Sequence, residues 1–148
     1  MPTGRARDRI YPRSVGVLGH GFLAEPVLQR LLRALPAATH ISTYGRNPDL
    51  LAELQQLGAH RAASPADLAA RSEYVLVLLE KLEDLEDDLS GSSGLQAGVH
   101  SPTILVMGAI STPDDLRNLA SELADKTAGL LRVVDAPLSG THVTAARG

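Results

Sequence analysis

The sequence predicts an α/β fold built on a doubly wound, mostly parallel β-sheet. Three observations favour this class. Short β-rich runs alternate with helical patterns, several of those runs are almost continuously apolar, and the first run meets a glycine-rich junction that opens a helix. Strands that are apolar on both faces are typical of a parallel sheet with helices on each side. The commonest arrangement of this kind is a Rossmann-like sheet.

The expected elements follow in order along the chain. The candidate strands share short apolar or β-branched runs: Ser14–Leu18, His40–Tyr44, Ala59–Ala62, Tyr74–Leu79, Thr103–Met107 and Leu130–Asp135. The candidate helices lie between them: Leu23–Ala34, Pro48–Leu57, Pro65–Ala70 and Pro113–Lys126.

A further short helix is expected after the fourth strand, in the segment EKLEDLEDDLSG. Leu82, Leu85 and Leu89 would form its inner stripe. The acidic run Glu80–Asp88 would form its solvated face. The sequence SGSSG at 90–94 predicts a surface turn.

Composition limits the function classes. With 148 residues and 44% hydrophobic content, the chain is long enough for one globular domain, expected at 14–148 behind a flexible leader at 1–13. A net charge of -3 and only 3% aromatic residues give no reason to expect nucleic acid as a partner. The absence of cysteine excludes thiol chemistry, and the five histidines lack metal-ligand spacing, so no metal is expected. No apolar run is long enough to span a membrane, and a cytoplasmic location is the default expectation.

The most informative stretch is the junction GHGFLA, directly after the first candidate strand. It fits G-x-G-x-x-G/A, and in this setting each small residue has a task. Gly19 allows the tight turn, Gly21 lets a pyrophosphate approach the backbone, and Ala24 lets the helix pack closely on the sheet. The N–H groups near Phe22 and Leu23, at the positive end of the helix dipole, would hold the phosphates. A tight turn without a ligand is the alternative, but the strand–loop–helix setting favours a dinucleotide.

The end of the second strand indicates which dinucleotide is bound. NAD-binding sheets usually carry Asp or Glu there, which accepts hydrogen bonds from the ribose 2′-hydroxyl, whereas a nearby Arg suits a 2′-phosphate. This chain has Gly45 and Arg46 at that place, and its next carboxylate, Asp49, lies in the following helix. Arg46 can offer a bidentate fork to a phosphate, and Asn47 can cap the helix opened by Pro48. The pattern favours NADP over NAD, with a solvated surface arginine as the alternative.

A second candidate binding loop follows the last strand, in VVDAPLSGTHVTAARG. The strand ends at Asp135 and Pro137 stiffens the turn. Ser139, Gly140 and Thr141 then present hydroxyl and N–H groups at a strand's carboxyl end, where ligands bind in open α/β sheets. Such a loop can hold a substrate carboxylate beside the nicotinamide, although the same three residues also suit a simple turn.

Four stretches of the chain together resemble the β-hydroxyacid dehydrogenase family, which includes 3-hydroxyisobutyrate, tartronate semialdehyde and 6-phosphogluconate dehydrogenases and the related imine reductases. GVLGHGFLAEPVLQRLL is similar to the family's glycine-rich opening, and YGRN to the Asn-Arg-Thr of its NADP-using members. SEYVLVLLEKLEDLEDDL resembles the fourth strand and the loop after it, which implies that Leu79 and Glu80 border the cofactor. VVDAPLSGTHVTAARG resembles the family's Asp-Ala-Pro-Val-Ser-Gly-Gly segment. The resemblance runs from about Ser14 to the C-terminus.

The resemblance implies reversible hydride transfer between a nicotinamide and a small β-hydroxy acid, whose carboxylate would be bound by residues 139–141. In this family a lysine acting as general acid/base comes from a helical second domain that follows the sheet. The two lysines here, Lys81 and Lys126, lie in no matching motif. No catalytic residue is therefore expected in this chain, which should bind cofactor without turnover. The domain is expected to be incomplete at its C-terminus, before the family's last strands and helical domain.

Two departures from the family pattern fall in the expected site, and the first of them supports an alternative function. Ala109 and Ile110 stand where members usually have a Ser-Thr pair, and Thr141 stands where a second glycine is usual. The segment TPDD at 112–115 is better explained as a helix cap than as a displaced site. The alternative is a non-catalytic NADP-binding or oligomerisation module. An imine reductase-like enzyme is a third possibility, although the Asp-Ala-Pro-Leu-Ser-Gly segment favours an acid substrate. An exposed sheet edge would favour homo-oligomers.

Overall fold

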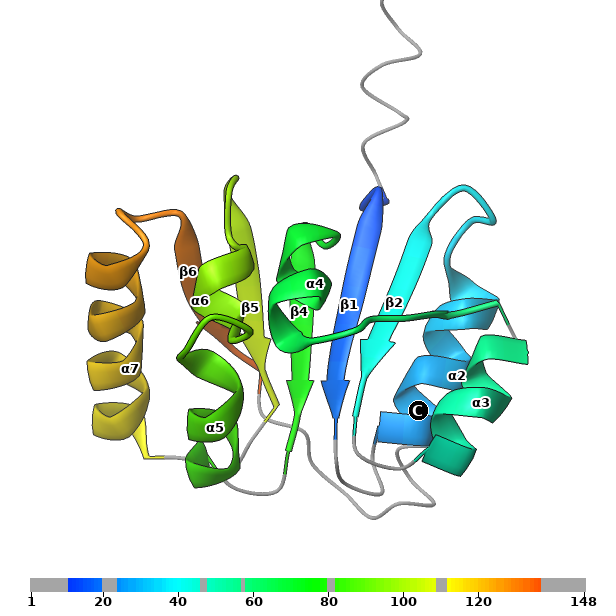
Figure 1. Cartoon of the computed structure of the whole chain (residues 1–148), viewed down its shortest axis with the longest axis horizontal. Coiled ribbons are helices and arrows are strands. Elements are labelled where there is room, and N and C mark those ends of the chain that lie inside the picture. The colour runs from blue at the N-terminus through cyan, green and yellow to red at the C-terminus, as the bar shows by residue number, and fades with distance from the viewer. Residues whose placement is uncertain are drawn as a thin grey trace, which may run out of the picture.

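The structure is a computed structural model that describes residues 11–19, 24–45, 48–56, 58–79, 82–108 and 112–136. Its centre is a six-stranded sheet in the order β3-β2-β1-β4-β5-β6, in which every neighbouring pair is parallel (Figure 1). This is the doubly wound Rossmann order, and the predicted fold class is confirmed.

The strands lie close to where the sequence predicts them. Their bounds are β1 Ser14–Gly19, β2 His40–Tyr44, β3 His60–Arg61, β4 Tyr74–Leu78, β5 Thr103–Met107 and β6 Leu131–Asp135. The largest difference is β3, predicted as Ala59–Ala62, which keeps only two paired residues at the sheet edge. Ala59 and Ala62 are buried beside it, so the apolar signal there reports packing rather than ladder pairing.

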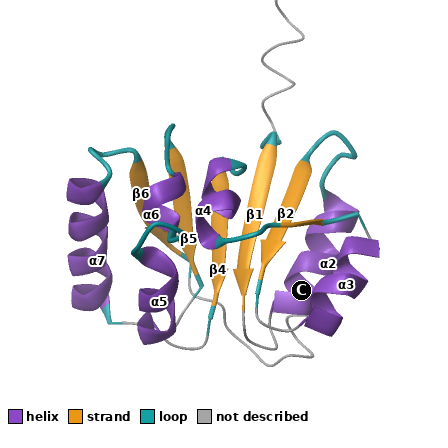
Figure 2. Cartoon of the chain, in the orientation of Figure 1, coloured by secondary structure: helices purple, strands orange, loops and turns teal. Residues whose placement is uncertain are grey.

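The helices are α2 Ala24–Ala34, α3 Pro48–Gln56, α4 Pro65–Ala70, the 3₁₀ helix η1 Leu82–Leu85, α5 Glu86–Leu89, α6 Leu95–Gly98 and α7 Pro113–Lys126 (Figure 2). The predicted cap of α7 is confirmed, because the Thr112 hydroxyl accepts a hydrogen bond from the Asp115 N–H at 3.2 Å. The sequence did not predict α6. Gly98 ends α6 against the backbone of α4, where an added Cβ would lie 1.9 Å from the Ala66 carbonyl oxygen.

The core has two parts, one on each face of the sheet. Leu18, Val75 and Val77 point to the face covered by α4 to α7 and belong to the larger cluster. Val17 and Leu78 alternate with them and join the smaller cluster, which packs under α2 and α3. Nearly continuous apolar strands therefore serve two helical layers, as the sequence predicted.

The short helices after β4 correct one expectation. Leu85 and Leu89 of the predicted inner stripe are buried, and Leu82 is half-buried. The acidic run is exposed at Glu83 and Glu86, as expected for a solvated face. Asp88, however, is only 5% exposed, because the chain passes from η1 into α5 and turns this position inward.

One part of the sheet has no helix over it among the described residues. On the face opposite α5 and α7, Ile104 and Val106 of β5 are half-buried, whereas Leu76 of β4 packs against the smaller cluster under α2. Val134, which is beside Val106 in the ladder, is 48% exposed. This apolar strip, formed by Ile104, Val106 and Val134 of β5 and β6, is called the open face.

Candidate functional site

The six strands end along one edge of the sheet, and the candidate site lies there. In Figure 1 the arrowheads of β1, β2, β4 and β5 all point to this edge. The chain winds from β1 outward to β3 and then returns to β4 on the other side of β1. The carboxyl ends of β1 and β4 therefore flank the topological switch point, where ligands bind in open α/β sheets.

The strand end that opens the glycine-rich junction lies at the centre of this edge. Gly19 is the last residue of β1 and is in register with Leu78 of β4. The helix α2 begins at Ala24, so strand and helix are joined by the short connection that the motif predicts. The first turn of this helix has N–H groups without intrahelical acceptors and the positive end of the dipole. Gly21, Phe22, Leu23 and the side chain of Ala24 lie outside the described residues.

Gly45, directly after β2, packs against this junction. A Cβ on Gly45 would lie 2.5 Å from the carbonyl oxygen of Gly19, a distance at which the backbone would have to shift. The missing side chain thus lets the end of β2 approach the end of β1. Any residue with a Cβ at position 45, Asp and Glu included, would require the backbone at Gly19 or Gly45 to shift. The predicted cofactor contacts Arg46 and Asn47 lie outside the described residues.

The neighbouring strands reach the same edge in register. The Gly108 N–H donates to the Val77 carbonyl at 2.9 Å, and the Ala136 N–H donates to the Met107 carbonyl at 3.0 Å. Leu79, predicted to border the cofactor, is 4% exposed, and its side chain belongs to the larger core cluster. Only its main chain is therefore available to a ligand.

The other predicted site residues lie outside the described part of the chain: Glu80, Ser139, Gly140 and Thr141. The substrate-loop hypothesis and the role of Glu80 stay predictions. The strands that precede these residues, β4 and β6, end at Leu78 and Asp135, and both ends lie on the ligand-binding edge.

The titratable groups of the described residues show one clear perturbation, and it is structural. The pKa of Asp67 is lowered, first because its carboxylate accepts the Ala63 N–H at 3.0 Å and then because it accepts the Arg71 Nε–H at 2.8 Å. Asp67 belongs to the first turn of α4, where the Ser64 hydroxyl caps its N–H. It supports the helix and performs no evident chemistry.

The described residues contain no cluster of three or more His, Asp or Glu side chains able to hold a metal ion. No helix among them is both long and apolar enough to cross a bilayer.

Sequence reasoning identified the glycine turn but missed the contact that supports it. The close approach of Gly45 to Gly19 joins residues far apart in the sequence. The one available signal was a glycine at a strand end where a carboxylate is usual. A turn-permitting glycine and a packing glycine cannot be distinguished by sequence alone.

Comparison with known proteins agrees with this arrangement. Residues 14–148 match the family described as the NAD binding domain of 6-phosphogluconate dehydrogenase. L-threonate dehydrogenase of Cupriavidus necator is 32% identical over 92% of this chain and 44% of its own length. The mitochondrial 3-hydroxyisobutyrate dehydrogenase of Rattus norvegicus is 28% identical over 85% of this chain and 36% of its own length. The chain thus spans less than half of each of these relatives.

Solved structures share the fold. Psf3, solved with NADP+ and 2-OPP, has a TM-score of 0.76 at 21% identity and is matched over 90% of this chain and 45% of its own. A variant imine reductase from Myxococcus stipitatus, solved with NAD+, has a TM-score of 0.75 at 17% identity over 89% of this chain and 42% of its own. These structures support the fold assignment. Because one was solved with NADP+ and the other with NAD+, they do not distinguish between the two cofactors for this chain.

Proposed function

Because the chain belongs to the family of the NAD binding domain of 6-phosphogluconate dehydrogenase, we propose that it is the NADP-binding part of a β-hydroxyacid dehydrogenase-like oxidoreductase. The observation that carries the proposal is the contact between Gly45 and Gly19 at the carboxyl edge of the sheet. It brings the end of β2, which reads the adenosine ribose in such folds, against the turn that receives the pyrophosphate.

The residues present fit a dinucleotide. Gly19 ends a central strand at the switch point, and α2 begins five residues later with its N-terminus toward the same edge. In the proposed site, Gly19 makes the turn, Gly21 lies under the pyrophosphate, and the N–H groups of Phe22 and Leu23 bind the phosphate oxygens. Ala24 keeps the helix close to the sheet.

Two features of the chain favour NADP over NAD. An acidic side chain at position 45, which would accept the ribose 2′-hydroxyl, has no space in this backbone. The next residue, Arg46, supplies a guanidinium suited to a 2′-phosphate, and Asn47 adds an amide donor. The main chain of Leu79 and the side chain of Glu80 complete the proposed cofactor border on the β4 side.

The proposed reaction is hydride transfer to or from a small β-hydroxy acid. When bound, the nicotinamide supplies the hydride donor or acceptor. Ser139, Gly140 and Thr141 would hold the substrate carboxylate beside it, at the end of β6. The acid/base group is proposed to come from outside this chain, since neither Lys81 nor Lys126 lies in a sequence motif that matches the family's lysine. The proposed setting is cytoplasmic, with homo-oligomers supported by the apolar open face.

A second candidate is a non-catalytic NADP-binding module. It is supported by Ala109 and Ile110, which lack the hydroxyl groups that the family usually places near the nicotinamide and substrate. Both candidates require the cofactor site. They differ in whether a hydroxy acid binds in the presence of NADP+.

Isothermal titration calorimetry with NADPH and NADH tests the proposal. The wild-type chain should bind NADPH at least tenfold more tightly, and Arg46→Ala should remove that advantage while leaving NADH binding nearly unchanged. Arg33→Ala, which removes an exposed arginine from the last turn of α2, is the matched control and should behave as wild type. Equal affinities for the two nucleotides, or an Arg46→Ala variant that keeps the preference, would overturn the NADP assignment.

A further inference from the structure

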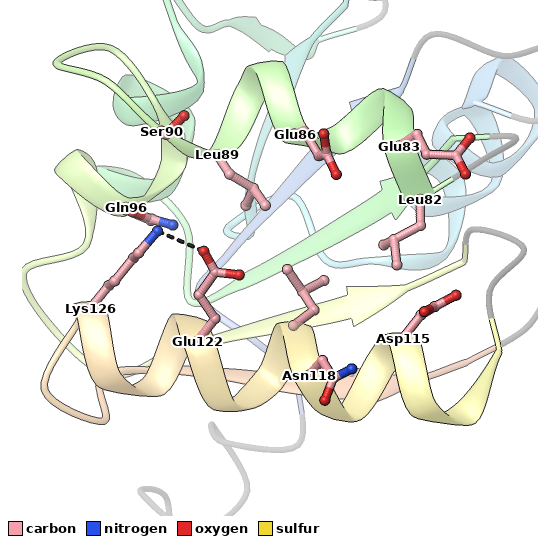
Figure 3. Close-up of a pocket in the computed structure, with 11 residues that line it drawn as sticks. Leu82, Glu83, Glu86, Leu89, Ser90, Gln96, Asp115, Asn118, Glu122 and Lys126 are labelled. Atoms are coloured by element: carbon pink, nitrogen blue, oxygen red, sulfur yellow. Dashed lines mark hydrogen bonds and ion pairs between the residues drawn. The ribbon is translucent and has the colours of Figure 1, made fainter.

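A second feature of the molecule lies on the helical layer and shares no residue with the proposed nucleotide site. A groove of 480 Å³ runs between η1 and α5 on one wall and α7 on the other (Figure 3). The α7 wall is a single helix face, because its lining residues Asp115, Leu119, Glu122 and Lys126 are spaced by three or four positions. From Asp115 to Lys126 this face is about 16 Å long, or about three helical turns.

The floor of the groove is apolar. Leu82 and Leu89 project from their wall toward α7 in Figure 3, and Leu119 lines the opposite wall. Leu82 and Leu119 are only half-buried, so solvent reaches part of this floor. Covering them with another apolar surface is favourable by the hydrophobic effect.

The rims are acidic on both sides. Glu83 and Glu86 lie on the wall formed by η1 and α5. Asp115 and Glu122 lie on the wall formed by α7. Among the described residues that line the groove, the one cation is Lys126, which is paired with Glu122 at 2.6 Å. Within the described ranges, Glu83, Glu86 and Asp115 have no ion-pair partner. The groove therefore offers three exposed carboxylates around an apolar floor.

We propose that this groove docks a basic amphipathic helix of a partner protein. The floor would take an apolar stripe with anchors at i, i+3 or i+4, and i+7, which is the spacing that a helix presents to a groove. Lysine or arginine side chains on both flanks of that stripe would meet the two acidic rims. The charges would speed association and set the orientation of the helix, and their effect would weaken with salt.

The chain's own basic segment fits the groove less well. Residues 1–10 carry Arg5, Arg7 and Arg9, which match the charge of the rims. They include Pro2 and Gly4, and they lack a stripe of large apolar residues for the floor. Charge alone would suit either occupant, and the apolar floor selects the amphipathic helix.

Fluorescence anisotropy with a labelled peptide tests the proposal on the full chain. The probe is an acetylated, amidated peptide of about four turns, with leucine at i, i+3, i+4 and i+7 and lysine elsewhere. The triple variant E83Q/E86Q/D115N should bind it at least tenfold more weakly than wild type, and Leu119→Ala several-fold more weakly. Asp125→Asn is the matched control, because it removes an exposed acid of α7 that does not line the groove, and it should bind within twofold of wild type.

Three results would overturn the proposal. The first is equal binding by the triple variant and by Asp125→Asn, with folding of both verified by circular dichroism. The second is equal binding of a peptide whose leucines are replaced by serine, which would make the groove a general cation-binding surface. The third is tighter binding of a peptide of residues 1–13 than of the probe, which would assign the groove to the chain's own segment.

Discussion

The two faces of β5 and β6 have similar apolar sequences and different environments. Leu105 and Met107 point toward α5 and α7 and are 0% exposed. Their neighbours in the same strand, Ile104 and Val106, point to the open face and are half-buried. Apolar continuity of a strand thus predicts that both faces are built for burial, while the helices determine which face is buried within this chain.

The two parts of the sheet differ in how many of their faces are covered by helices, and we expect stability to depend on this cover. On the first half of the sheet, helices cover both faces, with α4 on one side and α2 and α3 on the other. Over β5 and β6, the described helices cover one face of the sheet. Substitutions on the two faces should therefore have unequal effects, although the residues are of the same kind.

The largest expected effect is that of Leu105→Ala. It should lower the free energy of unfolding by about 3 kcal/mol, because it leaves a cavity in the covered core. Val106→Ala should cost about 1 kcal/mol or less, since that side chain is half-buried before substitution. Urea unfolding of both variants measures the difference. Equal decreases in the free energy of unfolding would mean that the open face is covered in solution and would contradict the difference between the two faces.

The second-largest effect is expected for Gly45→Ala. It should lower the free energy of unfolding by about 1–3 kcal/mol, because the new Cβ meets the backbone of Gly19. It should also weaken nucleotide binding. Gly58→Ala is the control, because Gly58 has a φ of 109° with open space around it. That variant should also lose stability, through backbone strain, yet bind nucleotide as wild type does. If both variants bound nucleotide equally well, the contact at Gly45 would have no role in the site.

The N-cap of α7, the helix that packs on the covered face, should matter less. Its removal should lower the free energy of unfolding by less than Leu105→Ala or Gly45→Ala does. Thr112→Ala removes the hydroxyl that accepts the Asp115 N–H and should cost about 1 kcal/mol. Thr112→Ser keeps the acceptor and should restore most of the loss. Thermal unfolding followed by circular dichroism compares the two. A serine variant as unstable as the alanine variant would contradict the role of the cap.

The smallest expected effect is the pH dependence due to Asp67. Its pKa is lowered in the folded chain, so it stabilises the fold at pH values above its unfolded pKa, and this contribution is lost as the pH falls through the folded pKa. Asp67→Asn should therefore have a lower free energy of unfolding than wild type at pH 7. In acid the difference between the two free energies should become smaller. Denaturant unfolding at pH 7 and at about pH 3 tests this, and a gap that widens in acid would contradict it.

The sequence predicted most of the fold because the strong signals were local. Apolar runs placed β2 and β5 at their observed bounds, and Pro113 with the acidic first turn placed α7. Of the proposed site, it predicted a strand that leads into the glycine-rich segment and a helix that follows it. These signals depend on spacing along the chain, which a single sequence contains.

What the sequence could not predict depends on contacts between distant residues. The helix α6 has four residues and no useful period, and its Gly98 is explained only by the approach of Ala66. The burial of Asp88 depends on how η1 continues into α5, and the role of Gly45 depends on the carbonyl of Gly19. Each is a tertiary contact without a local pattern.

The central claim is that the carboxyl edge around β1 and β2 binds a dinucleotide. Titrating NADP+ into the isotope-labelled chain, followed by backbone amide NMR spectra, tests it most directly. The account predicts that the largest shifts fall on the amides of residues 19–24, 45–47 and 49, with none along the groove between α5 and α7. Shifts confined to other surfaces, or unchanged spectra of a folded chain at millimolar nucleotide, would contradict it.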